Sequence, residues 1–481
     1  MPEVSRRRRL LVLAICCMSL VIVGLDNTIV NVALPSIQRE LHASVSGLQW
    51  TVDAYTLVIA SFLMLAGSTA DRFGRRRTFQ TGLAAFTLGS LLCSLAPSLG
   101  WLIVFRMLQA IGGSMLNPVA MSIIVNTFTD PRERARAIGI WGGTVGLSLA
   151  LGPVVGGVLI ASVGWRGIFW VNIPVGVAAI VLTALFVPES RAPHPRRFDP
   201  VGQLLVIVTL ASLIYAIIEG PSSGWGSAEI VGFFGLSAVT LAALLIYEPR
   251  RNEPLLDLRF FCSAPFSGAT VIAISAFAAL GGFLFLNTLY LQDVRGYSAL
   301  HAGLLTLPLA VATAFFAPIS GRIVGRSGPR LPLLIAGVTM TAGGVLLTGL
   351  TNRTSVGWLL FAYVVFGIGF GMVNAPITNT AVSGMPRDQA GVAAAVASTS
   401  RQIGQTLGVA VVGSAVTSAL VGPFGTAFTS ASHVGWWIVT GCGAAVLAVG
   451  MLTSGRWARA TAARTAGRLM SGEPRIPAST P

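Results

Sequence analysis

The chain contains no lysine and little charge of either sign. Charged residues make up 10% of its 481 residues, whereas an ordinary soluble domain carries about 25%. Because 54% of the residues are hydrophobic and the mean hydropathy is +0.77, a water-soluble globule is excluded. Without lysine, the phosphate-binding sequence GxxxxGK[ST] cannot occur, which excludes an ATP-driven pump built on that sequence.

Cysteine and histidine are scarce and scattered. The five cysteines lie within or beside apolar runs without the paired spacing of a metal or redox site; they are Cys16, Cys17, Cys93, Cys262 and Cys442. The four histidines fall in expected loops, at His42, His194, His301 and His433. These patterns support neither a metal site nor a catalytic triad. We therefore expect no catalytic residues, no metal and no cofactor.

Long apolar runs fill most of the chain. A bilayer span needs about 20 mostly apolar residues, and the sequence offers fourteen such runs separated by short polar connectors. They lie near residues 10–35, 48–69, 79–96, 101–125, 138–160, 167–187, 201–219, 228–247, 264–290, 302–321, 331–350, 356–380, 391–419 and 434–453. The first run is longer than a secretory signal, so we expect it to remain as the first span. The sequence predicts an all-helical integral membrane protein with fourteen transmembrane helices.

All 32 basic residues are arginines, and their distribution sets the topology. With the N-terminus inside, the inner segments hold 26 arginines and the outer segments hold four. Cytoplasmic loops carry such an excess of arginine, so we expect both termini in the cytoplasm and the protein in the cell (inner) membrane. The net charge of +15 is then explained by topology, and no nucleic-acid partner is expected.

A weak internal repeat indicates two related halves. At an offset of 254 residues, Gly67, Arg72, Gly74 and Arg76 match Gly321, Arg326, Gly328 and Arg330. Paired halves are the usual plan of secondary transporters, with substrate bound between them. We expect a six-helix bundle in residues 1–187, two inserted helices with linkers in 188–263, a pseudo-symmetric six-helix bundle in 264–453, and a disordered cytoplasmic tail in 454–481.

The loop between the second and third runs reads GSTADRFGRRR. Its simplest interpretation is a positively charged anchor at the inner surface. The ordered spacing, however, resembles the loop signature of the major facilitator superfamily, and the resemblance implies a latch for the cytoplasmic gate. The expected gate residues are Gly67, Asp71, Arg72, Gly74, Arg75 and Arg76. In the second half Gly325 replaces the acid, so any latch there must be weaker or different.

Three ionisable residues fall inside the N-terminal spans. Asp26 lies about 24 Å along the first span, and Arg106 lies about 8 Å from the outer end of the fourth. Asp53 has a similar depth in the second span. Charges inside spans usually face a cavity and pair, so we expect one polar cluster. We expect Asp26 to bind the proton and Arg106 to modulate it; in RMLQAIGG of the fourth span, Arg106 resembles the proton-coupling arginine of the family. The alternative is a structural ion pair that never titrates, with Asp53 charged near the water boundary.

The fifth span contains GIWGGTVGLSLALGPVVGG. Glycine and proline weaken a helix, so this run indicates a bend or a close helix contact. The end of the run resembles the fifth-span signature of drug:proton antiporters, which importers of the superfamily generally lack. Its residues are Gly152, Pro153, Gly156 and Gly157, and the resemblance implies that they seal the transporter against leak.

STSRQIGQTLGVAV, near residue 400, has the character of the fourteen-span, QacA/EmrB-like group. The resemblance implies a monomeric, proton-coupled antiporter that exports small lipophilic or cationic compounds by alternating access within membrane lipid. The expected substrate-cavity residues are Trp50, Tyr55, Trp141, Asn374 and Arg401, although aromatic residues near span ends are often interface anchors. A proton-coupled metabolite importer and a membrane sensor on a transporter scaffold are the alternatives.

Overall fold

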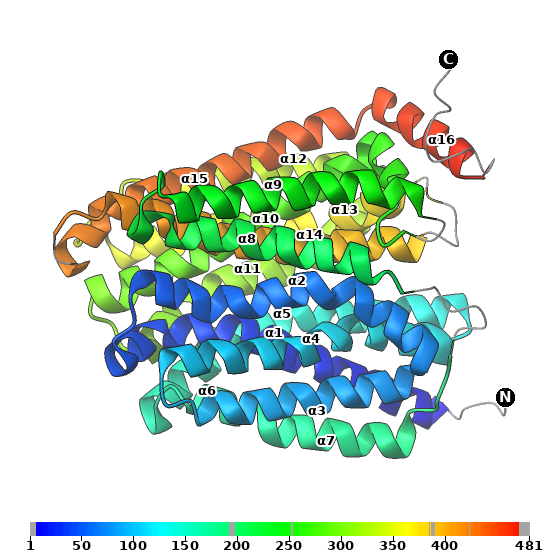
Figure 1. Ribbon diagram of the computed structural model, residues 1–481, viewed down its shortest axis with the longest axis horizontal. Coiled ribbons are helices and arrows are strands. Elements are labelled where there is room, and N and C mark those ends of the chain that lie inside the picture. Colours follow the sequence, from blue (N-terminus) through cyan, green and yellow to red (C-terminus); the bar gives the residue numbers. More distant parts are fainter. Residues whose placement is uncertain are drawn as a thin grey trace. The chain divides into compact units, whose positions relative to one another are not determined.

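A computed structural model of the chain describes residues 6–191, 198–251, 254–383, 385, 390–422 and 424–470. Every regular element in these ranges is a helix (Figure 1). Twelve of the helices are long and apolar enough to cross a bilayer, judged by length and composition. The predicted all-helical membrane fold is therefore confirmed.

The number of helices apolar enough to span a bilayer is lower than the fourteen expected. Helices α3 (Arg75–Ser94) and α14 (Ala390–Ala419) occupy two of the fourteen expected runs, but neither is among the twelve that meet the measure of apolarity. Helix α3 opens with three consecutive arginines, and α14 contains Arg401 among serine, threonine and glutamine. By this measure the described part of the chain has twelve spans instead of fourteen.

The chain divides into two compact units, and the first comprises residues 1–198 and 291–310. Its helices are α1 (Arg6–Leu41), α2 (Val45–Phe73), α3, α4 (Leu99–Thr127), α5 (Pro131–Val163), the short α6 (Gly167–Trp170) and α7 (Asn172–Phe186). The segment from Leu291 joins this unit because the side-chain amide of Gln292 donates to the Val32 carbonyl of α1 (2.8 Å).

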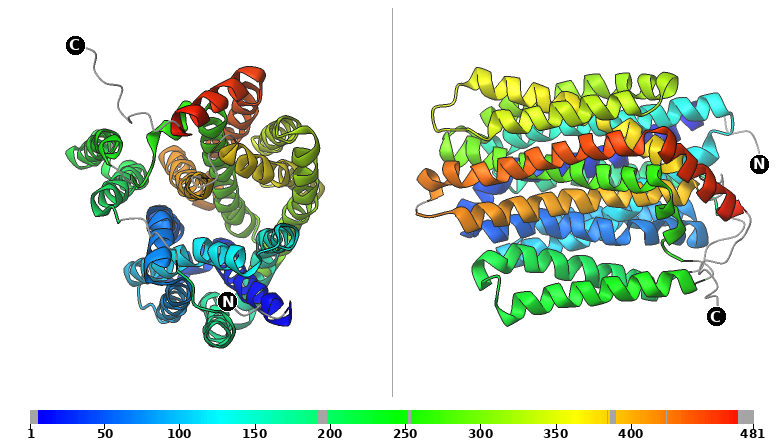
Figure 2. Two further views of the ribbon diagram at one scale, coloured as in Figure 1. Left: turned by 90° about the vertical axis from the view of Figure 1, so that its right-hand side faces the viewer. Right: turned by 90° about the horizontal axis from the view of Figure 1, so that it is seen from above.

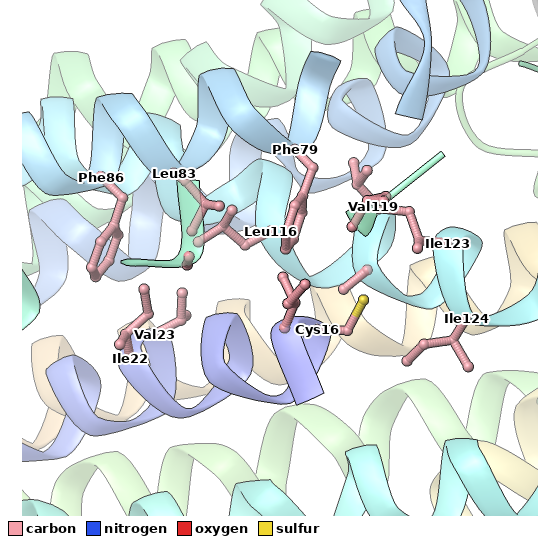
Figure 3. Close-up of a cluster of buried hydrophobic side chains, with 14 of the residues drawn as sticks. Cys16, Ile22, Val23, Phe79, Leu83, Phe86, Leu116, Val119, Ile123 and Ile124 are labelled. Carbon is pink, nitrogen blue, oxygen red and sulfur yellow. The ribbon is translucent and has the colours of Figure 1, made fainter. Parts of the chain in front are cut away.

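A dry core fills the space between α1, α3 and α4 (Figure 3). Phe79, Leu83 and Phe86 of α3 point toward side chains from α4 and α1, and all three are fully buried. The close approach of α3 and α4 depends on Gly112, where an added Cβ would lie 2.6 Å from the carbonyl oxygen of Gly82. Small residues permit such contacts between membrane helices.

The second unit comprises residues 199–290 and 311–481. Its helices are α8 (Pro200–Ser223), α9 (Ala228–Tyr247), the 3-10 turns η1 (Glu248–Arg250) and η2 (Leu258–Cys262), α10 (Ala264–Leu289), α12 (Arg330–Leu347), α13 (Val356–Val382), α14, α15 (Phe424–Thr453) and α16 (Arg456–Met470). Helices α8 and α9 lie side by side (Figure 2), and α8 also packs against α14. Helix α11 (Ala299–Ser327) and the π-helical turn η3 (Tyr290–Val294) contain the divisions between the units.

Part of the expected disordered tail is helical. Residues 456–470 form α16, which packs against α10 and η2. Alanine, arginine and leucine are good helix formers, and one face of α16 carries small residues that fit against its neighbours. Residues 471–481 of that tail lie outside the described residues.

Two glycines of the internal repeat occupy equivalent turns. Gly74 connects α2 to α3 with φ of 107°, and Gly328 connects α11 to α12 with φ of 84°. A residue with a side chain rarely adopts this left-handed backbone conformation. The requirement for glycine at both turns gives a physical reason for this part of the repeat.

Candidate functional site

The first unit contains a fully buried ion pair. The guanidinium of Arg106 in α4 pairs with the carboxylate of Asp26 in α1, and neither side chain is more than 1% exposed. The expected proximity of these two residues is therefore observed. An uncompensated buried charge is costly, whereas a pair with further hydrogen bonds is tolerated. The other polar groups around the pair supply those bonds.

Two amides complete the shell of Asp26. Its Oδ1 accepts hydrogen bonds from Nε2 of Gln109 (2.8 Å) and from Nδ2 of Asn172 (3.1 Å). The hydroxyl of Ser90 accepts from the same two amides and donates to the Phe169 carbonyl. The acid is thus bound by residues from α4 and α7, and α3 holds their amides in place.

Arg106 is held equally firmly. Its Nε donates to the Thr51 carbonyl of α2 (3.3 Å), and its Nη1 donates to Oε1 of Gln109 (2.8 Å). The guanidinium carbon lies 4.0 Å from the ring centroid of Tyr55, a distance typical of a cation–π interaction. Tyr55, expected in the substrate cavity, is fully buried beside the arginine, and its contact with substrate stays a prediction.

Sequence reasoning missed Gln109, Asn172 and Ser90. Gln109 lies three residues after Arg106 and so shares its helix face, which was a usable signal. Asn172 starts α7, a helix of otherwise apolar character, and a buried amide in such a segment needs a partner. Ser90 gave no signal, because serine hydroxyls commonly bond within their own helix.

Asp53 is not part of this cluster. It is fully buried in α2, yet among the described residues it forms no ion pair with Arg106. The expected single cluster of three ionisable groups is wrong in this respect. The physical reason is that Arg106 bonds α2 through the backbone carbonyl of Thr51 and not through the Asp53 side chain.

The loop between α2 and α3 contacts an acid that the sequence analysis overlooked, Glu189. Oε1 of Glu189, which follows α7, accepts hydrogen bonds from the backbone N–H groups of Arg76 (3.1 Å) and Ser190 (3.0 Å). Its bond with Arg76 caps one of the backbone N–H groups that have no partner inside the helix at the start of α3. A Cβ on Gly74 would lie 2.6 Å from Oε1 of Glu189, a flexible side chain that could shift, so the requirement for glycine here rests on its positive φ.

The charged residues of the gate loop have distinct partners. Asp71 forms an ion pair with Arg75 one helical turn away (2.9 Å). Arg72 lies over the ring of Phe198 at 5.1 Å, and Phe198 stacks on Phe73. Gly67 has space around it, because an added Cβ would meet nothing within 4 Å. Neither an ion pair nor a stacking contact shows the expected gating role, which remains a prediction.

The glycines of α5 pack against α1 beside Asp26. A Cβ on Gly152 would lie 2.7 Å from Cβ of Thr28, and one on Gly156 would lie 2.7 Å from Cγ1 of Ile29. Thr28 and Ile29 follow Asp26 by two and three residues. The glycine-rich face therefore brings the backbone of α5 close to the helix that carries the acid.

The same helix touches the start of α11 within the first unit. A Cβ on Gly157 would lie against Cα of Leu300 and 2.9 Å from the carbonyl oxygen of Ala299. Reciprocally, a Cβ on Gly303 would lie 2.7 Å from the carbonyl carbon of Pro153. These backbone contacts explain the spacing of the motif, because any larger residue would push the helices apart.

The remaining expected cavity residues are divided between the units. Trp50 and Trp141 lie half-buried in the first unit, and Asn374 lies half-buried in the second. Arg401, also in the second unit, donates to the hydroxyls of Thr378 (2.6 Å) and Ser398 (3.4 Å). Across the described ranges, no three His, Cys, Asp or Glu side chains gather closely enough to hold a metal ion.

Comparison with known proteins gives a consistent answer. The profile of the Major Facilitator Superfamily matches residues 16–409. The multidrug resistance protein Stp of Mycobacterium tuberculosis (strain CDC 1551 / Oshkosh) is 40% identical over 408 residues, which cover 85% of this chain and 76% of Stp. The tetracenomycin C resistance and export protein of Streptomyces glaucescens is 38% identical over 81% of this chain and 73% of its own length.

The fold agrees with this relationship. The crystal structure of a bacterial homolog of the human lysosomal transporter Spinster, in an inward-facing and occupied conformation, matches with a TM-score of 0.65 and 19% identity over 99% of this chain and 100% of that chain. At that identity the likeness concerns the fold alone. From the sequence profile and the relatives together, this chain belongs to the Major Facilitator Superfamily and is a membrane transporter rather than an enzyme.

Proposed function

We propose that the protein exports small lipophilic or cationic compounds, such as drugs, antibiotics or toxic metabolites, in exchange for protons. The observation that carries this proposal is the buried pair of Asp26 and Arg106, on which the amides of Gln109 and Asn172 converge. The names of the relatives, a multidrug resistance protein and an antibiotic export protein, support the substrate class.

In this proposal Asp26 is the acid that takes up and releases the proton. Protonation would remove the charge that holds Arg106, and the guanidinium would keep its contacts with the Thr51 carbonyl, Gln109 and the rings of Tyr55 and Phe169. A proton would thus change the contacts between α1, α4 and α7 at one point. Asp53 is the second candidate, because its carboxylate is fully buried in the same unit and forms no ion pair among the described residues.

Export is favoured over import by the glycine face of α5. Gly152 and Gly156 bring the α5 backbone against α1 within one turn of Asp26, and Gly157 brings it against α11. A shift of α1 at Asp26 would therefore disturb the contact between α1 and α5, which leaves no free space. We propose that this contact seals the transporter against leak while the proton and the substrate exchange.

We further propose fourteen spans with both termini in the cytoplasm of a monomer in the inner membrane, as in the QacA/EmrB-like group. Helices α3 and α14 would supply the two additional spans, because each packs extensively against a span of its own unit, α4 or α10. Two six-helix bundles, with α8 and α9 inserted, would alternate access. Asp71, Arg75 and Glu189 would close the cytoplasmic gate, and Trp50, Trp141, Asn374 and Arg401 would contact substrate.

The test is transport by the purified protein in liposomes with an imposed pH gradient. A toxicity panel in a pump-deficient host, with proton-ionophore controls, first identifies a compound that the protein removes. We expect that compound to move against its own gradient while protons move in the opposite direction. Cotransport of proton and compound in one direction would instead identify an importer, and no movement of any compound would favour a sensor.

A further inference from the structure

Helix α16 is strongly basic and amphipathic. It carries four arginines and no acidic residue over its fifteen positions. Its buried positions recur at helical spacing, at Ala458, Thr461, Ala462, Thr465 and Leu469. A repeat of this kind places the buried residues on one face and the charges on the other.

The buried face is occupied by the protein itself. Helix α16 packs against η2 and α10, and the backbone N–H of Ala264, at the start of α10, donates to the Thr461 hydroxyl (3.0 Å). The small side chains of this face let α16 lie close to its neighbours. Helix α16 is therefore a docked element with a fixed orientation, and its charged face points away from the second unit.

The outward face presents arginine with one aromatic residue. Arg456, Arg459, Arg464 and Arg468 are exposed, and Trp457 is 63% exposed. Arg456, Arg459 and Arg464 form no ion pair within the part of the chain that the structure describes. A surface of this composition, on which three arginines have no ionic partner among the described residues, fits an anionic partner.

The position of α16 identifies that partner. Only two residues, Ser454 and Gly455, separate α16 from α15, which is one of the membrane spans. The arginines must therefore lie at the membrane surface, where anionic headgroups are concentrated. Tryptophan is also enriched at this depth of a bilayer, so the exposed Trp457 agrees with the same location.

We propose that the outward face of α16, defined by these four arginines and Trp457, binds the headgroups of anionic phospholipids. Each arginine near an anionic surface strengthens binding by about fivefold. Through Thr461 the bound lipid would also hold the start of α10 in place. The proposal concerns a lipid site outside the transport pathway, so it does not depend on which compound is moved.

Amide hydrogen exchange in nanodiscs tests the proposal on the full chain. The amides of residues 456–470 are followed in discs of phosphatidylcholine and in discs that also contain phosphatidylglycerol. We expect exchange at least fivefold slower with phosphatidylglycerol, and slower exchange at Ala264 as well. Equal rates for the wild-type protein in the two kinds of disc would overturn the proposal without any variant.

Two variants locate the effect. Replacing the four arginines with glutamine removes the charge while keeping a similar helix propensity, and the difference between the two kinds of disc should fall below twofold. Replacing them with lysine keeps the charge and should preserve most of the difference. A glutamine variant that responds as the wild type does would contradict the proposal. So would protection of α16 by duplex DNA in detergent where phosphatidylglycerol gives none, because the surface would then fit a nucleic acid.

Discussion

Replacing Asp26 with asparagine tests the proposed proton coupling most directly. The substitution keeps the size of the side chain and can still accept hydrogen bonds from Gln109 and Asn172 at one oxygen. It removes the negative charge opposite Arg106, which is fully buried. Asp26→Asn should therefore abolish uphill export and substrate-induced proton release, while binding of an uncharged compound in detergent survives.

The expected loss of folding stability follows from the burial of the ion pair. Leaving one partner of a buried ion pair uncompensated typically costs about 3–5 kcal/mol. Asp26→Asn should lower stability by an amount of this order, because Arg106 loses its anionic partner and keeps only uncharged ones among the described residues: the Thr51 carbonyl, Gln109 and the rings of Tyr55 and Phe169. The double variant Asp26→Asn with Arg106→Gln removes both charges and should recover much of the stability. It should remain unable to couple, which separates folding from transport.

The assay is accumulation in liposomes under an imposed pH gradient. Each pH unit is worth about 1.4 kcal/mol per proton, or a tenfold concentration ratio. With two pH units and one proton per substrate, the wild-type protein should approach a hundredfold accumulation, and Asp26→Asn should only equilibrate the compound. Asp26→Glu should keep partial activity with a shifted pH optimum. If purified Asp26→Asn still drives the compound uphill, the reasoning is wrong and Asp53 becomes the coupling candidate.

Three further predictions concern the seal, the gate and the topology. Gly157→Leu should abolish export while the protein still reaches the membrane, because its Cβ would lie 2.9 Å from the backbone oxygen of Ala299. The control variant Gly143→Leu lies in open space on the same helix and should export normally. Equal efflux from both variants would remove the basis for a seal. Gly74→Ala should impair efflux from whole cells, because alanine at this positive φ is strained by about 1–2 kcal/mol and its Cβ would lie 2.6 Å from Glu189. Wild-type efflux from this variant would count against a constrained gate turn. A reporter fused after residue 470 should be active only in the cytoplasm, and a periplasmic signal would overturn the topology.

The sequence was most informative about charges inside apolar helices. Asp26 and Arg106 were expected to lie close together because an isolated charge in a membrane span is costly, and that argument needs no knowledge of the fold. The close packing of α5 could also be predicted, because repeated glycine in a membrane helix indicates a close helix contact. Their partner α1 could not be deduced, because glycine specifies closeness and not identity.

The other residues of the site could not be identified from the sequence. Gln109, Asn172 and Glu189 are uncharged amides or an acid near a helix end, and such residues are common in membrane proteins without a special role. Asp53 resembled Asp26 in depth along its span, yet it forms no ion pair with Arg106; depth along a helix does not determine which way a residue faces. The tail was expected to be disordered because it lacks an apolar run, but a docked helix needs only a narrow face of small residues.

Helices α3 and α14, both too polar to be counted among the twelve spans, form the two most extensively packed pairs, α3 with α4 and α14 with α10. During synthesis their entry into the bilayer should depend on those partners. Helix α10 already exists when α14 emerges, whereas α3 emerges before α4 and must wait for it. A nascent chain ending near residue 98 should therefore leave α3 accessible to water, and extension through residue 127 should bury it. The order of elements along the chain thus sets the order in which the first unit can be assembled in the membrane.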